Sequence, residues 1–176
     1  MAISLNEYQN EAMRTAIYPE DRGLEYTTLG LLSEVGELAG AWLGGEVKDI
    51  LSETGDNYWY AAAIAHSLGE QLESVLVFAN IDDSIDYKPL EELFPALSYY
   101  AGEIAGAVKK SIRDNDGELS TSAYNKIMDN LANVLKVLDT IALHFDATPA
   151  GVQTMNLDKL ADRQRRNVLG GNGDNR

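Results

Sequence analysis

The sequence predicts an all-α protein, and three observations lead to that prediction. Apolar residues recur at helical spacing along nearly the whole chain, whereas the alternation typical of β-strands is almost absent. Residues that start and end helices separate these periodic segments. Apolar residues make up 45% of the 176 residues, enough for the core of one compact domain. We therefore expect a single domain over residues 1–176.

The first three helices have recognisable boundaries. Ser4 and Glu7 are spaced as a capping box, which starts a helix that we expect to reach about Ile17. The segment "YPEDRG" then breaks the chain. Gly44-Gly45 separates two further helices, because paired glycines interrupt helical periodicity. These two helices are expected over about 27–43 and 47–66.

Four more helices follow in the second part of the chain. A short one ends near residue 80, and "DDSIDYKP" reads as a polar linker. The next two are expected from Pro89 to about Arg113 and from about Thr121 to His144. Thr148 and Pro149 are a good N-cap and first helical residue for the seventh helix. The Gly-rich ending "GGNGDNR" reads either as a loose tail or as a segment that closes over a ligand.

The net charge of −14 comes almost entirely from the first half of the chain. Residues 1–88 hold 4 Lys and Arg against 16 Asp and Glu, which gives −12, and residues 89–176 hold 10 against 12, which gives −2. Binding to duplex nucleic acid depends on neutralising phosphates, so a protein this acidic is a poor candidate for it. A small phosphorylated ligand bound through metal ions remains possible.

Three features that the sequence lacks predict a cytoplasmic location: cysteine, a signal peptide and a membrane-spanning segment. The chain has no cysteine, which excludes disulfide bonds and thiolate metal sites and fits a reducing cytoplasm. Its first residues lack the basic and apolar regions of a signal peptide. No apolar run is long enough to span a bilayer, so we expect no membrane partner.

An internal repeat predicts two degenerate helical hairpins, over about 25–86 and 89–170. "SEVGELAG" (33–40) resembles "YYAGEIAG" (99–106), and "ETGDNYWYAAAIA" (53–65) resembles "NLANVLKVLDTIA" (130–142). The alternative is a chance similarity between two amphipathic hairpins. Four acidic positions of the first copy align with mostly neutral ones of the second: Glu34, Glu37, Glu53 and Asp56 with Tyr100, Glu103, Asn130 and Asn133. Because the apolar positions persist where three acids are lost, the core does not need those acids.

The four acids of the first copy predict a metal site. Residues three apart lie on nearly the same face of a helix, so Glu34 projects with Glu37, and Glu53 with Asp56. A short connection makes the two helices antiparallel neighbours, which would bring all four carboxylates into one cleft. Close carboxylates must either take up protons or be neutralised by cations. The alternative is an ordinary solvated acidic face.

The expected ion is Mg²⁺ or Mn²⁺. All four ligands are hard oxygens, which suit these ions better than zinc. A diiron helical bundle would need Glu-x-x-His pairs, and neither histidine of the chain follows a glutamate at that spacing.

The motifs around these acids resemble those of the MazG-type nucleoside triphosphate pyrophosphohydrolases, in the all-α NTP pyrophosphatase superfamily. "ETGDNYWYAAAIA" is similar to the family's "ELGDvLWYlaalA". "NLDKLADRQRRNVLGGNGDNR" (156–176) is similar to the "NxxKLxxRxxRGxxxGxGDNR" ending of phage and bacterial members. "GEIAGAVKKSIRD" (102–114) also resembles a stretch that lies between the two acidic pairs in those relatives. The likeness covers most of residues 25–170.

The resemblance implies hydrolysis of a (deoxy)nucleoside triphosphate to the monophosphate and pyrophosphate. It implies that Glu34, Glu37, Glu53 and Asp56 hold two or three Mg²⁺ or Mn²⁺ ions and that an acid of this site activates water. It also implies a dimer or tetramer, and a phage enzyme would work in the host cytoplasm. In the usual family pattern one repeat carries both the acids and the basic tail. Here they are split between the copies, which predicts one composite site, formed within a chain or between chains.

The second copy supplies the residues expected to bind phosphate. Asn156, Lys159, Arg163 and Arg166 are spaced to share one helical face, and guanidinium and ammonium groups suit phosphate oxygens. Basic enrichment at a helix C-terminus is the alternative for the arginines. The other basic candidates lie together in the fifth helix: Lys109, Lys110 and Arg113.

The base of the substrate is less determined than its phosphates. Tyr60, Trp42 and Trp59 are candidates for stacking on it, although aromatic residues at helical spacing are commonly core residues. Asn57 and Asn80 are candidates for a hydrogen bond to the sugar or base. The leading reading is removal of dGTP or GTP, as phage enzymes of this type do. The alternatives are a dUTP or dCTP pyrophosphatase and a non-catalytic helical nucleotide-binding regulator.

Overall fold

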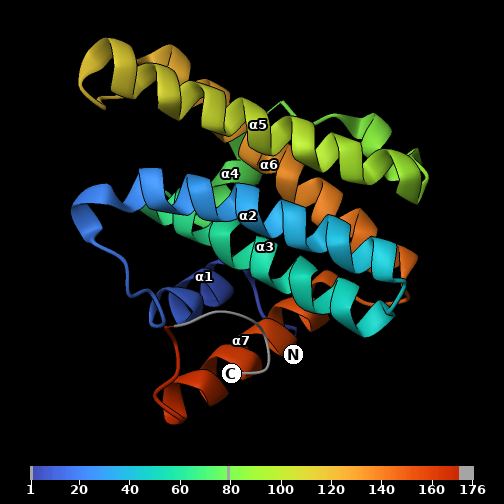
Figure 1. Cartoon of the computed structure of the whole chain (residues 1–176). Coiled ribbons are helices and arrows are strands. Elements are labelled where there is room, and N and C mark those ends of the chain that lie inside the picture. The colour runs from blue at the N-terminus through green and yellow to red at the C-terminus, as the bar shows by residue number, and fades with distance from the viewer. Residues whose placement is uncertain (1, 79, 171–176) are drawn as a thin grey trace.

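The computed structural model describes residues 2–78 and 80–170, and in these ranges the chain is built from helices alone (Figure 1). The predicted all-α fold is therefore confirmed. Two short 3-10 helices, η1 (Glu20–Arg22) and η2 (Asp83–Tyr87), lie between longer elements. The α-helices are α1 (Leu5–Met13), α2 (Gly23–Gly44), α3 (Val47–Ser67), α4 (Leu72–Phe78), α5 (Leu90–Asn115), α6 (Thr121–His144) and α7 (Pro149–Arg165).

Local signals set several of these boundaries. Both hydrogen bonds of the predicted capping box join Ser4 and Glu7 at the start of α1. The Thr148 hydroxyl accepts a hydrogen bond from the Gly151 backbone N–H and caps α7. Gly45 ends α2 with a φ of 79°, a left-handed conformation that glycine adopts without steric cost.

Two predicted boundaries were wrong by about one turn. The first helix ends at Met13 and not at Ile17. The Ala12 carbonyl at this end accepts hydrogen bonds from the Thr15 hydroxyl and from the indole N–H of Trp59, so tertiary contacts replace further helical turns. The second helix begins at Gly23, before the predicted start at Thr27, because η1 leads directly into it.

The helices form two antiparallel hairpins that pack on each other, α2 with α3 and α5 with α6 (Figure 1). α2 lies against α5 and α3 lies against α6, and the apolar faces of all four enclose the main core. Both predicted hairpins are present, and their origin as two copies of one unit stays a prediction. The core includes the fully buried side chains of Leu31, Leu38, Ile64, Leu97, Ile104 and Leu138.

The first and last helices, α1 and α7, meet on the opposite side of α3. α1 and α7 pack against α3 and against each other, below the α2–α3 hairpin in the view of Figure 1. This arrangement brings the C-terminal helix beside the acidic segment of the first hairpin. None of the helices in the described ranges combines the length and the apolar character needed to cross a membrane.

Candidate metal centre

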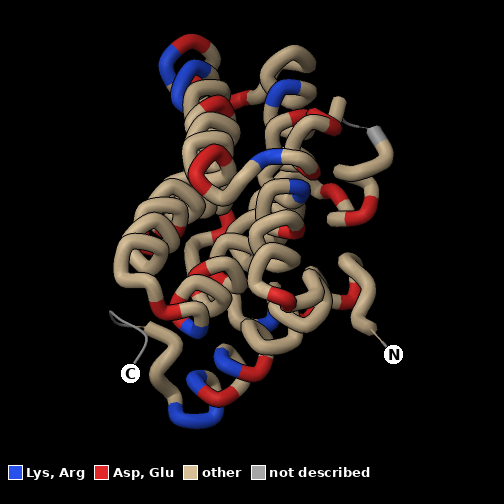
Figure 2. Tube along the Cα trace, turned by 90° about the vertical axis from the view of Figure 1, so that its right-hand side faces the viewer, with Lys and Arg blue, Asp and Glu red and all other residues tan. Residues whose placement is uncertain are grey.

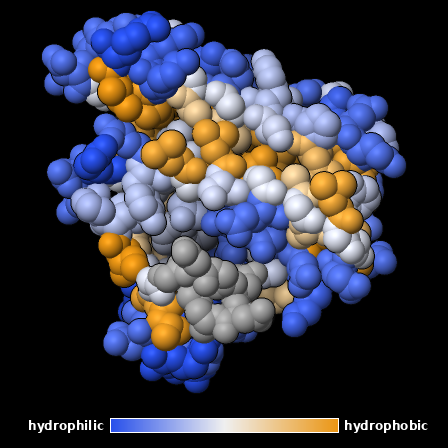
Figure 3. All heavy atoms as spheres, in the orientation of Figure 1, coloured by the Kyte–Doolittle hydropathy of each residue, from blue (hydrophilic) through white to orange (hydrophobic). Residues whose placement is uncertain are grey.

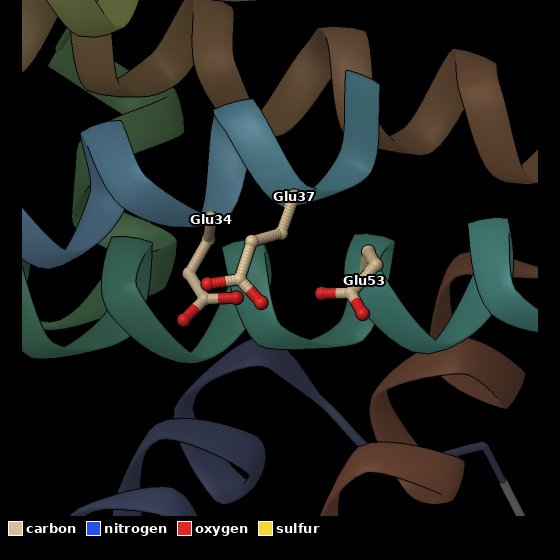
Figure 4. Close-up of side chains that lie close together, drawn as sticks. All are labelled: Glu34, Glu37 and Glu53. Atoms are coloured by element: carbon tan, nitrogen blue, oxygen red, sulfur yellow. The ribbon is translucent and has the colours of Figure 1, made fainter. Parts of the chain in front are cut away.

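Three carboxylates meet between α2 and α3. Glu34 and Glu37 project together from α2 toward Glu53 on α3, as Figure 4 shows. One carboxylate oxygen from each residue lies within 4.8 Å of the others. One carboxylate oxygen of Glu53 is buried, Glu34 is half-buried and Glu37 is exposed, so the group runs from the helix interface to the surface.

The donor set of this group fits a hard divalent cation. It consists of carboxylate oxygens alone, which Mg²⁺ and Mn²⁺ prefer over softer ligands. Three negative charges at this separation repel one another, and a dication between them would remove that repulsion. Of the described residues, these three form the one group of acids that meets the geometry of a metal site.

Asp56 lies beside this group but faces another helix. Its Oδ1 accepts a hydrogen bond from Asn156 Nδ2 at 2.8 Å, and its Oδ2 lies 2.6 Å from Lys159 Nζ. A residue three positions along a helix is rotated by about 60° from the first, and this rotation turns Asp56 from the Glu53 side toward α7. The structure thus gathers three of the four predicted carboxylates, with Asp56 at the edge of the cluster.

α7 supplies two of the predicted phosphate-binding residues from within the same chain. Lys159 Nζ donates a hydrogen bond to Ser52 Oγ at 2.9 Å in addition to its contact with Asp56. Gly55 allows the close approach of α7, because a Cβ at this position would stand 3.0 Å from Asn156 Cβ. The second half of the chain therefore does contribute to the surroundings of the acidic group.

Tyr8 of α1 completes this network of hydrogen bonds around Asp56. The sequence patterns did not predict a role for Tyr8 at the site. Its hydroxyl donates to Asn156 Oδ1 at 3.0 Å, which orients the amide so that its N–H groups face Asp56. Burial, together with the charge of Asp56, raises the pKa of Tyr8 well above its ordinary value, so the hydroxyl keeps its proton and remains a donor. The available signal was the i, i+4 spacing of Tyr8 and Ala12 on the buried face of α1.

The two predicted arginines of α7 have different positions. Arg163 is buried, with 4% of its surface exposed, whereas Arg166 lies at the helix end. Arg166 Nε is 2.7 Å from Asp162 Oδ2, an ion pair one turn apart. Asn156 and Lys159, two of the four residues predicted to share a face, contact Asp56.

The basic residues of α5 lie elsewhere. Lys109 and Lys110 are exposed near the C-terminal end of α5, and Arg113 forms an ion pair with its neighbour Asp114. Figure 2 shows Lys and Arg gathered both at this upper end of the molecule and, far from it, around the end of α7. A single chain therefore does not bring the α5 group to the carboxylates.

Tyr60 and Trp42, two of the predicted base-stacking residues, occupy different environments. Tyr60 packs edge-on against Trp59, with ring centroids 4.9 Å apart. Its pKa is raised chiefly by burial and further by Tyr26 and the charge of Glu34. Trp42 stacks against Phe94 with ring centroids 5.0 Å apart, so it packs between α2 and α5.

Asn57 does not fit its predicted contact with the sugar or base. The side chain is completely buried, and its Nδ2 donates to the backbone carbonyls of Glu34 and Glu53. The amide donors are therefore already used inside the protein. The predicted ending 171–176 lies outside the described residues.

The second hairpin has no comparable acidic group within the described part of the chain. The linker fills the corresponding place: the Tyr100 hydroxyl donates to Asp82 Oδ2 at 3.0 Å, and Asn133 Oδ1 accepts from the Asp82 backbone N–H at 2.7 Å. Glu103, which aligns with Glu37 in the predicted repeat, forms an ion pair with Lys126. These contacts occupy the positions that align with the acidic group of the first hairpin.

Comparison with known proteins gives a phage relative. No family model matches the chain, and no solved structure matches it. The Gene 37 protein of Mycobacterium phage L5 is 38% identical over 76 residues, which are 43% of this chain and 67% of the phage protein. Its name states no activity. With this identity and coverage, the chain belongs to the same protein family as the Gene 37 protein of Mycobacterium phage L5.

Proposed function

We propose that this protein is a metal-dependent pyrophosphohydrolase that converts a (deoxy)nucleoside triphosphate to the monophosphate and pyrophosphate. The observation that carries the proposal is the convergence of Glu34, Glu37 and Glu53 within 4.8 Å, with Lys159 and Asn156 on the adjacent Asp56. A site for a triphosphate needs carboxylates that bind divalent cations and a nearby ammonium group that binds phosphate oxygens. The MazG-like motifs around these residues support the same activity.

Each group of the site has a role in this proposal. When bound, Mg²⁺ or Mn²⁺ would offset the charge of the triphosphate and lower the pKa of a coordinated water. Glu34, Glu37 and Glu53 would hold the ions, with Asp56 as a further ligand, and one of these carboxylates would accept the proton of the attacking water. The water oxygen forms a bond to the α-phosphorus as the bond to the bridging oxygen breaks, and pyrophosphate leaves. Lys159 would stabilise the charge on the phosphate oxygens.

The substrate that we favour is dGTP or GTP, and Tyr60 is the aromatic residue best placed to contact it. Its ring lies between α2 and α3. The charge of Glu34 contributes to the raised pKa of its hydroxyl. A dUTP or dCTP pyrophosphatase would use the same carboxylates, so the two readings differ in substrate preference alone. A phage relative agrees with an enzyme that alters the nucleotide pool of an infected host.

Product analysis on a panel of nucleoside triphosphates with Mg²⁺ or Mn²⁺ tests the activity. We expect monophosphate and pyrophosphate in equal amounts, with no turnover in EDTA. Diphosphate with orthophosphate would contradict the proposed bond cleavage. Tight nucleotide binding without turnover in Mn²⁺ would instead support the non-catalytic regulator.

We also propose that the protein self-associates. Leu29, Leu32 and Leu43 of α2 are exposed, and Figure 3 shows apolar surface along α2 and α5. Exposed apolar surface of this kind favours contact with another protein surface. Light scattering coupled to size exclusion would give a dimer or tetramer if this is correct, and a monomer at all concentrations if it is wrong.

A further inference from the structure

Asn57 joins the two helices that carry the acidic group. Its side chain is fully buried in α3, with 0% of its surface exposed. Nδ2 donates to the Glu53 carbonyl oxygen at 2.9 Å and to the Glu34 carbonyl oxygen at 3.0 Å. The first hydrogen bond lies within α3, and the second crosses to α2. One amide thus links the backbones of two residues whose carboxylates converge.

The orientation of this amide follows from its partners. Carbonyl oxygens only accept hydrogen bonds, so the NH₂ end must face them and Oδ1 must point away. Oδ1 is buried and has no hydrogen-bond partner among the described residues. A buried acceptor without a partner costs free energy, which an apolar residue of similar size would avoid. Stability of the core therefore does not explain an asparagine at this position, whereas the two donated hydrogen bonds do.

Asn133 of α6 offers an internal comparison. Its Nδ2 also donates to the carbonyl four residues earlier, that of Asp129, at 2.7 Å, and to a carbonyl outside the helix, that of Asn80, at 3.0 Å. Its Oδ1 is satisfied by the Asp82 backbone N–H. The same pair of hydrogen bonds therefore holds the linker in the second hairpin, where the described residues form no comparable group of acids, and holds the Glu34 backbone in the first.

We propose that Asn57 is a positioning residue that fixes Glu34 relative to Glu53, so that their carboxylates can hold one divalent cation together. Metal affinity falls when the ligands are slightly misplaced. Residues that orient the ligands without touching the metal therefore affect metal affinity strongly. A slip of α2 along α3 would separate the carboxylates, and the hydrogen bond from Asn57 to the Glu34 carbonyl opposes that slip. This inference rests on the proposed function, because it presupposes the metal site.

Asn57→Thr separates the two hydrogen bonds. A threonine hydroxyl in a helix can donate to the carbonyl four residues earlier, as Thr54 does to Ile50 at 2.7 Å, but it is too short to reach α2. We expect Mn²⁺ to bind the full-length variant about 10–100-fold more weakly than the wild type, measured by calorimetry or by the EPR signal of free Mn²⁺. Asn133→Thr is the matched control, and its Mn²⁺ affinity should equal that of the wild type.

Turnover gives a second measurement of the same effect. The Mn²⁺ concentration for half-maximal activity should rise in Asn57→Thr, and saturating Mn²⁺ should restore kcat, which damage to the fold would not allow. Circular dichroism checks that the variant is folded, and Asn57→Leu, close in size, replaces it if it is not. Unchanged Mn²⁺ affinity in the folded variant would overturn the role of Asn57 and leave the proposed function intact. A wild type that binds no Mn²⁺ would overturn the proposed function and this inference with it.

Discussion

The ring of Tyr60 lies directly on the backbone of Gly30. A Cβ built on Gly30 would stand 1.9 Å from the Tyr60 Cε1 atom, a distance that no packing tolerates. The absence of a side chain at Gly30 is therefore what allows α2 and α3 to approach with the tyrosine between them. The same approach sets the distance between Glu34 and Glu53, which lie on these two helices.

Gly30→Ala should displace Tyr60 or push the helices apart. We expect the free energy of unfolding to fall by about 1–3 kcal/mol, as in other overpacked interfaces, and turnover to fall with it. Gly40→Ala on the same helix is the matched control, since nothing lies within 4 Å of its Cβ position. The free energy of unfolding of Gly40→Ala should rise by about 0.4–1 kcal/mol, because alanine restricts the conformations of the unfolded chain. Denaturant titration measures both changes, and equal stabilisation by the two variants would show that Tyr60 moves aside without cost.

Glu53→Gln should remove metal binding while leaving the fold intact. One carboxylate fewer weakens Mn²⁺ binding by at least about tenfold, since even residues behind the ligands have that effect. Circular dichroism in EDTA should show wild-type helical content, because glutamine has the size and shape of glutamate. Glu103→Gln, its control on α5, loses an ion pair with Lys126 worth about 0–1 kcal/mol and should keep full turnover. Near-normal turnover in Glu53→Gln would refute the site assignment.

Mn²⁺ should stabilise the wild-type protein. A ligand that binds the folded state alone adds about 2.7 kcal/mol at a concentration 100 times its Kd. We expect the melting temperature to rise with Mn²⁺ and to return to its starting value in EDTA. Glu53→Gln should show little of this rise, and an equal rise in both proteins would place the bound ion elsewhere.

Lys159→Met tests the contribution of α7. Asp56 would remain mostly buried without this ammonium, so we expect the free energy of unfolding in EDTA to fall by about 1–3 kcal/mol. Under the proposed function, loss of the Lys159 charge should also lower kcat/KM. Lys110 is exposed on α5. If one chain forms the whole site, Lys110→Met should change neither the free energy of unfolding nor kcat/KM. A comparable loss of kcat/KM in Lys110→Met would show that α5 of a second chain completes it.

Asp139 should make stability depend on pH in an unusual direction. Its carboxylate accepts a hydrogen bond from the buried Tyr58 hydroxyl, but burial outweighs this contact and raises the pKa of Asp139 above its ordinary 3.8. The folded state therefore holds this proton more tightly than the unfolded state does. The resulting stabilisation is complete below pH 3.8 and is lost as the pH rises through the folded pKa.

Asp139→Asn, which stays neutral, should consequently be more stable than the wild type near pH 7. The difference between the two should shrink as the pH falls and disappear below the ordinary pKa of Asp139. Denaturant titrations across this pH range measure it. A difference that does not vary with pH would mean that ionisation of Asp139 has no part in it.

The sequence by itself determined the helices and the pairing of acids on them. Helical periodicity and capping are local properties, so the α6 boundaries and the capping box of Ser4 follow from neighbouring residues alone. The spacing of three residues likewise places Glu34 beside Glu37 wherever the helix packs. Boundaries that depend on distant partners, such as the end of α1 beneath Trp59, could not be found in this way.

Only the tertiary structure decided what each acid faces. Asp56 has the same local spacing from Glu53 as Glu37 has from Glu34, yet it turns to Asn156, 100 residues away. Asn57 has the polarity of a ligand-binding residue, but the contact of α2 with α3 buries it and gives its amide two backbone carbonyls. Helix-packing angles and the burial that follows from them depend on the whole set of apolar faces in the chain. No short stretch of sequence contains that information, so the composition of the site depends on how α1, α2 and α7 close around α3.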